Sequence, residues 1–245
     1  MKDEGSKPQA ALPSCAILAG GLGTRLRPAV GALPKVLAPV HRRPYLTYLL
    51  DHLAAASVRE VVLLTGYGAD QVQWTLGETY RGLRLVYSPE PSPLGTGGAL
   101  RWALPKLASP VVLLMNGDSY CEVDLAAFAD FHRRQAADLS LVLTEVTDTS
   151  AYGRVQVAGG GQVVRFGEKE TDRKPGWINA GIYLLSRTLI EEIPAGRPVS
   201  LERDLIPAWL GRGTRVYGFR GGRFIDIGTP GAFAAAEAFL PPIRS

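Results

Sequence analysis

The sequence predicts an α/β fold, in which a mixed, mainly parallel central sheet lies between two layers of helices and a small β-rich lobe packs against it. Two observations predict this fold. Through residues 14–145, short apolar runs alternate with segments of helical periodicity, and such alternation implies right-handed crossovers between parallel strands. After residue 145, strand-like segments follow one another, and glycine-rich turns such as Gly159–Gly161 join some of them.

The predicted elements follow from these periodicities. Strand-like composition marks five segments of the first half, at residues 16–19, 61–65, 83–87, 111–115 and 139–144. Helical spacing marks the segments between them, at residues 45–56, 69–76, 96–104 and 125–135. In the second half, we expect strands at 155–157, 163–166, 178–185 and 215–219, and helices at 200–210 and 232–239. Because ligands of open α/β sheets bind beyond the carboxyl ends of the strands, the loops after Ala19 and Met115 are the expected site.

The length of the chain favours one domain. Its 245 residues can bury a full core, and we expect that domain to span residues 14–245, with halves at 14–145 and 146–245. Residues 1–13 are polar and lack the apolar centre of a signal peptide, so they are predicted to be a mobile tail. No apolar run reaches the roughly 18–20 residues that span a bilayer. We therefore expect a cytoplasmic protein with no membrane partner, and a homo-oligomer is compatible with the sequence.

Charge and cysteine content exclude several function classes. The net charge of +4 suits small anionic substrates, but no long basic run or basic-aromatic face indicates nucleic-acid binding. Only Cys15 and Cys121 are present, so neither a disulfide framework nor a zinc quartet is implied, and both thiols are expected in the core or at its rim. His41, His52 and His132 have no motif around them and are assigned to the surface or the core.

The most informative segment is the glycine-rich loop that follows the first predicted strand. Gly20, Gly21 and Gly23 offer backbone N–H groups that can approach phosphate oxygens closely. Arg25 and Lys35 supply the positive charge that a triphosphate requires. The run is not a Walker A loop, and the dinucleotide fingerprint fails because leucine stands at its third glycine position. A nucleotide site is therefore predicted here, and a plain glycine-rich turn is the alternative.

The pattern GGxGTRLxP followed by PKxL resembles the start of the sugar-1-phosphate nucleotidylyltransferases. These enzymes have a Rossmann-like three-layer fold and join an NTP to a sugar 1-phosphate, which gives an NDP-sugar and pyrophosphate. The runs PLGTGGAL, NGD and FIDIGTP are most similar to the bacterial D-glycero-α-D-manno-heptose 1-phosphate guanylyltransferases. Mannose-1-phosphate guanylyltransferases and N-acetylmuramate-1-phosphate uridylyltransferases are near alternatives. Gly167 departs from the family pattern, which leaves the exact sugar open.

The resemblance implies a catalytic set of cations and acids. Attack of a sugar phosphate on the α-phosphorus brings two anions together, so the transition state requires cations more than a base. Arg25 and Lys35 would hold the leaving pyrophosphate and the charge at the α-phosphate, and Lys169 would orient the acceptor. Asp118 and Asp226 would bind Mg²⁺, the implied cofactor, because carboxylates are hard oxygen ligands.

The resemblance also implies the residues that bind the two substrates. The predicted nucleotide contacts are Ala19, Gly20, Gly21, Gly23, Thr24, Arg25, Lys35, Glu90, Gly95, Thr96, Gly117 and Asp118. The predicted sugar-phosphate contacts are Asn116, Tyr152, Gly153, Glu168, Lys169, Asn179 and Gly181.

Glu90 bears on the choice of base. It stands near the position where thymidylyl- and uridylyltransferases often carry Gln. A carboxylate only accepts hydrogen bonds, so it suits the adjacent N1–H and N2–H₂ donors of guanine. Glu90 could also face solvent or a backbone N–H, so the sequence favours GTP without excluding another NTP.

Two rival classes remain open. A regulatory protein of the same fold would bind the nucleotide without turnover, although the five implied catalytic residues are all present. A dinucleotide-dependent oxidoreductase would share the α/β alternation but lacks its glycine fingerprint here.

Overall fold

The computed structural model describes residues 12–150, 152–169 and 173–242, with Glu168 and Lys169 described as backbone only. Residues 1–11 of the predicted tail lie outside the described part. The strands are β1 (Ser14–Ala19), β2 (Pro39–Val40), β3 (Arg43–Pro44), β4 (Glu60–Thr65), β5 (Thr79–Tyr80), β6 (Leu83–Pro89), β7 (Val111–Asn116), β8 (Ser119–Cys121), β9 (Leu139–Val146), β10 (Gly153–Val157), β11 (Val163–Lys169), β12 (Gly176–Ser186), β13 (Val216–Arg220) and β14 (Phe224–Asp226). The α-helices are α1 (Arg27–Val30), α2 (Leu46–Ala55), α3 (Ala69–Leu76), α4 (Gly95–Ala103), α5 (Leu125–Arg134), α6 (Arg187–Glu191), α7 (Ile206–Gly211) and α8 (Pro230–Phe239).

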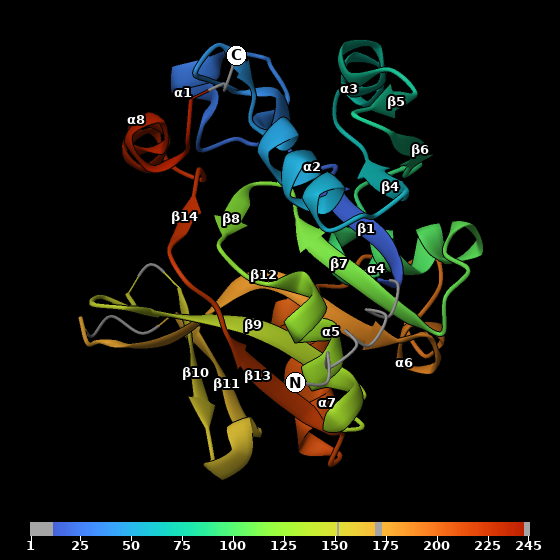
Figure 1. Cartoon of the computed structure of the whole chain (residues 1–245), viewed down its shortest axis with the longest axis vertical. Helices are drawn as coiled ribbons and strands as arrows, with labels where there is room; N and C mark the ends of the chain where they lie inside the picture. The colour runs from blue at the N-terminus through green and yellow to red at the C-terminus, as the bar shows by residue number, and fades with distance from the viewer. Residues whose placement is uncertain (1–11, 151, 170–172, 243–245) are drawn as a thin grey trace, which may run out of the picture.

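Ten of the described strands form one mixed sheet. Its path is β11-β10-β12-β7-β1-β4-β6-β5, with β9 paired to β12 and β13 paired to β9. Strands β5, β11 and β12 run against the other seven, which confirms a mixed, mainly parallel sheet. The β-rich second half continues this sheet, because β12 hydrogen-bonds along β7 with Ile182 opposite Met115. Figure 1 shows β12 crossing between β7 and β9.

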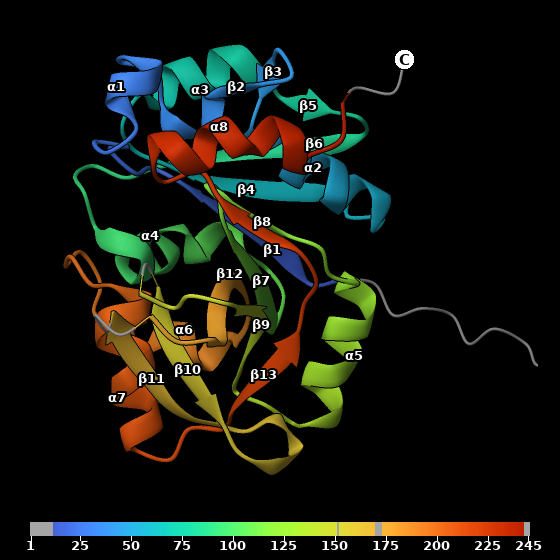
Figure 2. The same ribbon diagram turned by 90° about the vertical axis from the view of Figure 1, so that its left-hand side faces the viewer.

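Helices cover both faces of the sheet, as predicted. Side chains alternate along β1, so that Ile17 faces one hydrophobic cluster and Ala16 the other. Leucines of α2 and residues of α3 and α5 complete the first cluster, whereas α4, α6 and α7 complete the second. Figure 2 shows α4 and α7 on one side of the sheet and α5 on the other. No helix of the described residues is long and apolar enough to cross a membrane.

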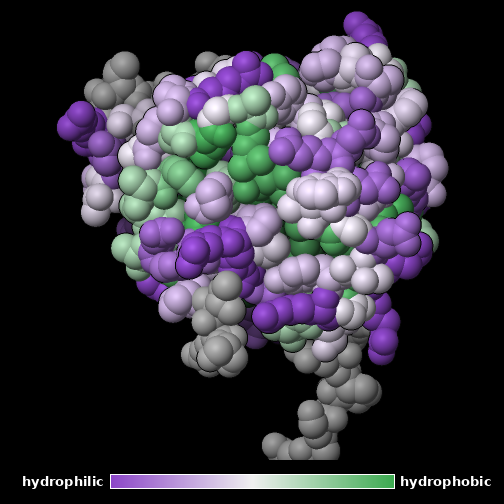
Figure 3. Space-filling view, turned by 90° about the horizontal axis from the view of Figure 1, so that it is seen from above, coloured by the Kyte–Doolittle hydropathy of each residue, from purple (hydrophilic) through white to green (hydrophobic). Residues whose placement is uncertain are grey.

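A separate two-stranded antiparallel sheet pairs β8 with β14, near the end of the chain. Asp226 of β14 lies opposite Ser119 of β8, and the Thr229 hydroxyl caps α8 by accepting the Ala232 N–H. Ile225 and Ile227 are buried in a third hydrophobic cluster under α8. Figure 3 views this end of the molecule, where hydrophobic side chains form a band between polar surfaces. These two strands were not predicted from the sequence, because three-residue strands leave little periodic signal.

Two predicted elements differ most from the structure. β11 continues past Phe166 to Lys169, because its antiparallel pairing with β10 extends to Gly153 opposite Lys169. The helix predicted at 200–210 is divided into a π-helical turn at Leu201–Leu205 and α7. The physical reason is Pro207, which lacks the N–H that a continuous α-helix would use in its second turn.

The cysteines and histidines take structural places. Cys15 and Cys121 are buried free thiols, and burial raises the pKa of each to about 12. His52 is half-buried, with Nε2 against the Val123 carbonyl. His132 is buried, with Nδ1 2.9 Å from the Ser140 hydroxyl. These placements confirm the predicted core and rim assignments.

His132 predicts a pH dependence of stability. Burial lowers the pKa of His132 to about 4, and the nearby charge of Asp138 partly opposes this shift. Between pH 6.5 and about 4 the unfolded chain therefore binds a proton that the folded protein does not, so stability falls as the pH falls through this window. We expect a loss on the order of 2 kcal/mol between pH 7 and pH 4 from this residue. Urea unfolding should show a steeper loss of stability between pH 7 and pH 4 for the wild type than for His132→Gln, in which other shifted groups such as His52 still titrate; equal slopes would contradict the assignment.

Candidate active site

The glycine-rich loop and the ends of three strands enclose a cavity of about 260 Å³. The loop follows β1, Glu90 follows β6, and Asn116 ends β7. Eight of the twelve predicted nucleotide contacts line this cavity: Gly20, Gly21, Lys35, Glu90, Gly95, Thr96, Gly117 and Asp118. The cavity therefore lies at the carboxyl ends of parallel strands, where the sequence placed it.

Gly117 is required because two strands approach closely. Its N–H donates to the Leu18 carbonyl at 2.9 Å, and a Cβ at this position would lie 2.2 Å from that oxygen. The contact holds the turn after β7 against the end of β1. It thereby sets the positions of Asn116 and Asp118.

Alanine at Gly117 is expected to destabilise the protein by about 3 kcal/mol, at the upper end of overpacking costs, because neither backbone can give way cheaply. Gly231, on α8, has nothing within 4 Å of its would-be Cβ. Gly231→Ala should therefore leave stability unchanged or raise it by about 0.5–1 kcal/mol. Thermal unfolding of both variants checks the pair, and equal midpoints would refute the close-approach argument.

A lysine lies between the two predicted metal carboxylates. Lys35 Nζ is 2.6 Å from Asp118 Oδ2 and 3.5 Å from Asp226 Oδ1, and the lysine side chain is only 11% exposed. Burial raises the pKa of Asp226, the nearby Asp118 raises it further, and Lys35 opposes both effects. The two acids thus form one negative cluster that depends on a cation.

The donor set fits a hard divalent cation that also binds substrate. No group of three or more His, Cys, Asp or Glu side chains that could hold a metal occurs within the described ranges. Two carboxylates leave coordination positions for phosphate oxygens and water, which is the usual arrangement for Mg²⁺. The structure brings Asp118 and Asp226 together, because both carboxylates contact Lys35 Nζ.

The other four predicted nucleotide contacts, Ala19, Gly23, Thr24 and Arg25, do not line this cavity. Gly23 has φ +58°, and its would-be Cβ lies 3.1 Å from Lys35 Cβ, so glycine lets the loop pack on that lysine. Arg25 Nη2 is 3.4 Å from the would-be Cβ of Gly228, and its charge lowers the pKa of Asp226. Thr24 is exposed and Ala19 is buried at the end of β1.

Glu90 both accepts a backbone N–H and lines the cavity, which are two of the alternatives that the sequence left open. Its Oε2 accepts the Leu94 N–H at 2.9 Å, and the residue lines the cavity of about 260 Å³, called the nucleotide-side cavity below. Oε1 occupies the space beside Gly20 and Gly66, where a Cβ would come within 2.9 and 2.5 Å. Burial raises the pKa of Glu90, and the Leu94 N–H opposes this.

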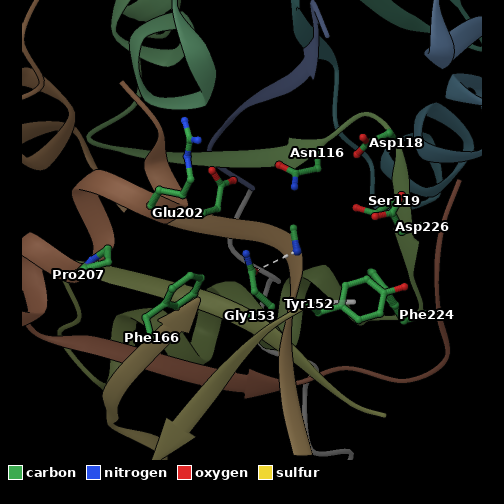
Figure 4. Close-up of a pocket in the computed structure, with 14 residues that line it drawn as sticks. Asn116, Asp118, Ser119, Tyr152, Gly153, Phe166, Glu202, Pro207, Phe224 and Asp226 are labelled. Carbon is green, nitrogen blue, oxygen red and sulfur yellow. Dashed lines mark hydrogen bonds between the residues drawn. The ribbon is translucent and has the colours of Figure 1, made fainter. Parts of the chain in front are cut away.

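A second cavity, of about 490 Å³, shares Asn116 and Asp118 with the first and is called the sugar-side cavity below. Five of the seven predicted sugar-phosphate contacts line it: Asn116, Tyr152, Gly153, Asn179 and Gly181. Figure 4 shows Tyr152 and Phe224 near Asp226 at one end, with Glu202 and Pro207 at the other. The side chains of Glu168 and Lys169 lie outside the described part of the chain.

The two cavities meet at Asn116 and Asp118, which line both. The buried Asn116 Oδ1 has no hydrogen-bond partner among the described residues. An unpaired buried acceptor is costly unless a ligand or water satisfies it. The junction therefore contains an acceptor that a water molecule, or a donor group of a ligand such as a hydroxyl, would satisfy.

Gly181 and Thr96 have structural roles beyond the predicted ones. Gly181 has φ +75°, and a Cβ there would lie 2.7 Å from Asn116 Nδ2 and 2.8 Å from Ser119 Oγ. The Thr96 hydroxyl donates to Glu202 Oε2 at 2.7 Å and accepts the Leu201 N–H at 2.8 Å. Both residues thus position their neighbours as well as lining a cavity.

Sequence reasoning missed several residues of the second cavity. These are Ser119, Phe166, Gly167, Glu202, Arg203, Pro207 and Phe224. Glu202 and Arg203 come from the π-helical turn, and such turns are frequent at functional sites. The only local signal was the Pro207 that interrupts the predicted helix.

Comparisons with known proteins show which proteins this chain is similar to. A family model described as nucleotidyl transferase matches residues 15–241. A mannose-1-phosphate guanylyltransferase of Mycobacterium tuberculosis is 40% identical over 227 residues, which are 91% of this chain but 63% of that protein's length. A D-glycero-α-D-manno-heptose 1-phosphate guanylyltransferase of Aneurinibacillus thermoaerophilus is 35% identical, over 91% of this chain and 96% of that protein. The crystal structure of HddC from Yersinia pseudotuberculosis complexed with GMP-PN superposes with a TM-score of 0.83 at 31% identity, over 93% of this chain and 99% of that one.

Proposed function

This chain belongs to the nucleotidyl transferase family, and we propose that it transfers a guanylyl group from GTP to a sugar 1-phosphate, D-glycero-α-D-manno-heptose 1-phosphate in the first instance. A phosphate oxygen of the sugar attacks the α-phosphorus of GTP, the bond to the β-phosphate breaks, and pyrophosphate leaves. The product is a GDP-sugar. No step requires a base, because the nucleophile is already ionised.

The observation that carries the proposal is the junction of the two cavities. A nucleotide in the smaller cavity and a sugar phosphate in the larger one would meet at Asn116 and Asp118. Holding two reactants in line at one point converts a bimolecular reaction into an effectively unimolecular one. Within the described part of the chain Asn116 Oδ1 has no donor, and a hydroxyl group of a substrate bound here would supply one.

The charged residues supply what the transition state requires. Lys35, and Arg25 near Asp226, would bind the phosphates and the charge that develops as pyrophosphate leaves. Gly20 and Gly21 would present backbone N–H groups to the phosphates. We expect Lys169 to orient the acceptor phosphate and Glu168 the sugar hydroxyls.

Asp118 and Asp226 would hold Mg²⁺, which supplies Lewis-acid neutralisation of phosphate charge when it is bound. Lys35 now neutralises the same two carboxylates. Its ammonium group would turn to the phosphates once the carboxylates are otherwise satisfied.

Glu90 supports guanine as the base. One oxygen accepts the Leu94 N–H, which fixes the carboxylate, and the group lines the nucleotide-side cavity. A fixed acceptor matches the paired N1–H and N2–H₂ donors of guanine better than the single N–H of uracil or thymine. The GMP-PN complex of HddC agrees with this choice.

Mannose 1-phosphate is the second candidate acceptor, favoured by the 40% identity to the mycobacterial mannose-1-phosphate guanylyltransferase. The heptose differs from mannose by one additional carbon with its hydroxyl, and the larger cavity of about 490 Å³ has room for either sugar. The identity of the acceptor therefore depends on a small number of polar contacts.

Pyrophosphate release tests the proposal. With Mg²⁺ present, GTP, UTP, dTTP, CTP and ATP are each combined with heptose, mannose, glucose and N-acetylmuramate 1-phosphates. Turnover confined to GTP with the heptose phosphate is the expected result. Turnover with mannose phosphate selects the second candidate, and another base would overturn the role of Glu90. If no pair releases pyrophosphate, a nucleotide-binding protein without turnover would be favoured.

A further inference from the structure

Glu202 heads a chain of hydrogen bonds that ends at the sugar-side residue Asn179. Glu202 Oε1 accepts from the Tyr183 hydroxyl at 3.0 Å, and the Tyr183 oxygen accepts from Asn179 Nδ2 at 2.6 Å. Asn179 Oδ1 accepts the Gly181 N–H at 3.0 Å. Tyr183 is fully buried, and β12 is irregular between Asn179 and Tyr183, where Gly181 has φ +75°. This set of Glu202, Tyr183 and Asn179 is called the relay below.

The carboxylate fixes the direction of every bond in the relay. An ionised carboxylate only accepts, so the Tyr183 hydroxyl must donate to it. The Tyr183 oxygen can then only accept from Asn179, which must present its NH₂ group. The Gly181 N–H independently requires the Asn179 oxygen on the other side. The amide therefore has one allowed orientation.

The carboxylate is itself held from a second direction. Thr96 Oγ1 and Ser200 Oγ both donate to Glu202 Oε2, at 2.7 and 3.1 Å. Burial raises the pKa of Tyr183 well above its ordinary value, with a further contribution from the charge on Glu202, so the phenol keeps its proton. Glu202 thus has both oxygens occupied and acts on other protein groups.

We propose that Glu202 is a positioning residue for the acceptor: through Tyr183 it locks the Asn179 amide so that the second N–H of that amide is offered to an oxygen of the sugar phosphate. This inference rests on the proposed function for its substrate, and on the hydrogen-bond geometry alone for the relay. Asn179 and Glu202 both line the sugar-side cavity, so the locked donor lies where the acceptor would bind.

The relay makes a specific prediction for two conservative variants. Tyr183→Phe removes the hydroxyl that joins Glu202 to Asn179. Glu202→Gln allows an amide N–H to face the Tyr183 oxygen, so the phenol can turn its proton toward Asn179 and oppose the amide orientation that the Gly181 N–H alone then holds. Either change should raise the KM for the sugar 1-phosphate about tenfold, while the Kd for GTP alone stays within twofold. The double variant should be no worse than the more affected single variant, because both act through one path.

Two measurements test this. The first is steady-state kinetics of the wild type, both variants, the double variant and the controls Tyr217→Phe and Glu191→Gln, which lie outside both cavities. The second is the NMR signal of the Asn179 side-chain amide in the ligand-free protein, which does not depend on turnover. We expect the two relay variants to shift this signal and to speed its hydrogen exchange, whereas the controls leave it unchanged.

Additive KM effects, or an Asn179 signal that neither variant moves, would overturn the relay. If the wild type releases no pyrophosphate with any substrate pair, the proposed function fails. In that case the NMR signal and calorimetric binding of the sugar phosphates still decide whether Glu202 orients Asn179.

Discussion

Asp118→Asn is expected to lower kcat on the order of 10³-fold while leaving the fold intact. The carboxylate lines both cavities and lies 2.6 Å from Lys35, so the change removes charge at the point where the two substrates would meet. The amide has nearly the same shape, and its oxygen can still accept from the lysine. The variant should therefore unfold at nearly the wild-type temperature.

Pyrophosphate release and thermal unfolding check this prediction together. Asp130→Asn is the matched control, because Asp130 is on α5 and pairs only with the exposed Arg133 in the described contacts. A near-normal rate for Asp118→Asn would remove Asp118 from the metal-binding and catalytic set.

Lys35→Met is expected to lower kcat on the order of 10²–10³-fold, the cost of losing one donor to the transition state. Its side chain is 11% exposed and joins Asp118 to Asp226. Methionine fills a similar volume but leaves two carboxylates without their cation. We therefore also expect the metal-free variant to unfold at a lower temperature than the wild type, with the difference reduced by added Mg²⁺.

The same two assays separate these effects. Lys106→Met controls for loss of charge, because Lys106 is exposed at the end of the 3₁₀ turn Leu104–Lys106 and lines neither cavity. Lys35→Arg should not restore the rate, because a planar guanidinium cannot replace a point charge between two carboxylates. A rate within threefold of the wild type would show that Lys35 is structural only.

Local patterns predicted the first half of the fold well. The strands around Ile17 and Leu113 are apolar except at one end because helices cover both faces, and such runs are read directly from the sequence. The continuation of the sheet through β12 was not predicted, because the pairing of Ile182 with Met115 joins segments far apart in the chain. Strand order depends on contacts that periodicity does not encode.

In the site, too, the residues of local motifs were predicted and those that depend on tertiary contacts were not. Gly20, Lys35 and Asp118 lie in motifs with fixed spacing, and the structure brings them to one cavity. Glu202 belongs to a solvated-looking run between Ser200 and Asp204, and nothing local distinguishes it from a surface acid. Its partners Tyr183 and Thr96 come from β12 and α4. Only tertiary structure reveals that they converge.

The pairing of β12 with β7 has a consequence for any attempt to divide the protein. Without β12, the backbone donors and acceptors along one side of β7 would have no partner, next to the apolar side chains of Leu113 and Met115. An unprotected central strand of this kind is a template for intermolecular pairing. A fragment ending near residue 150 should therefore aggregate when it is produced alone. Co-expression with the remainder of the chain should rescue it as a split protein, whose reassembly could be followed by regained pyrophosphate release.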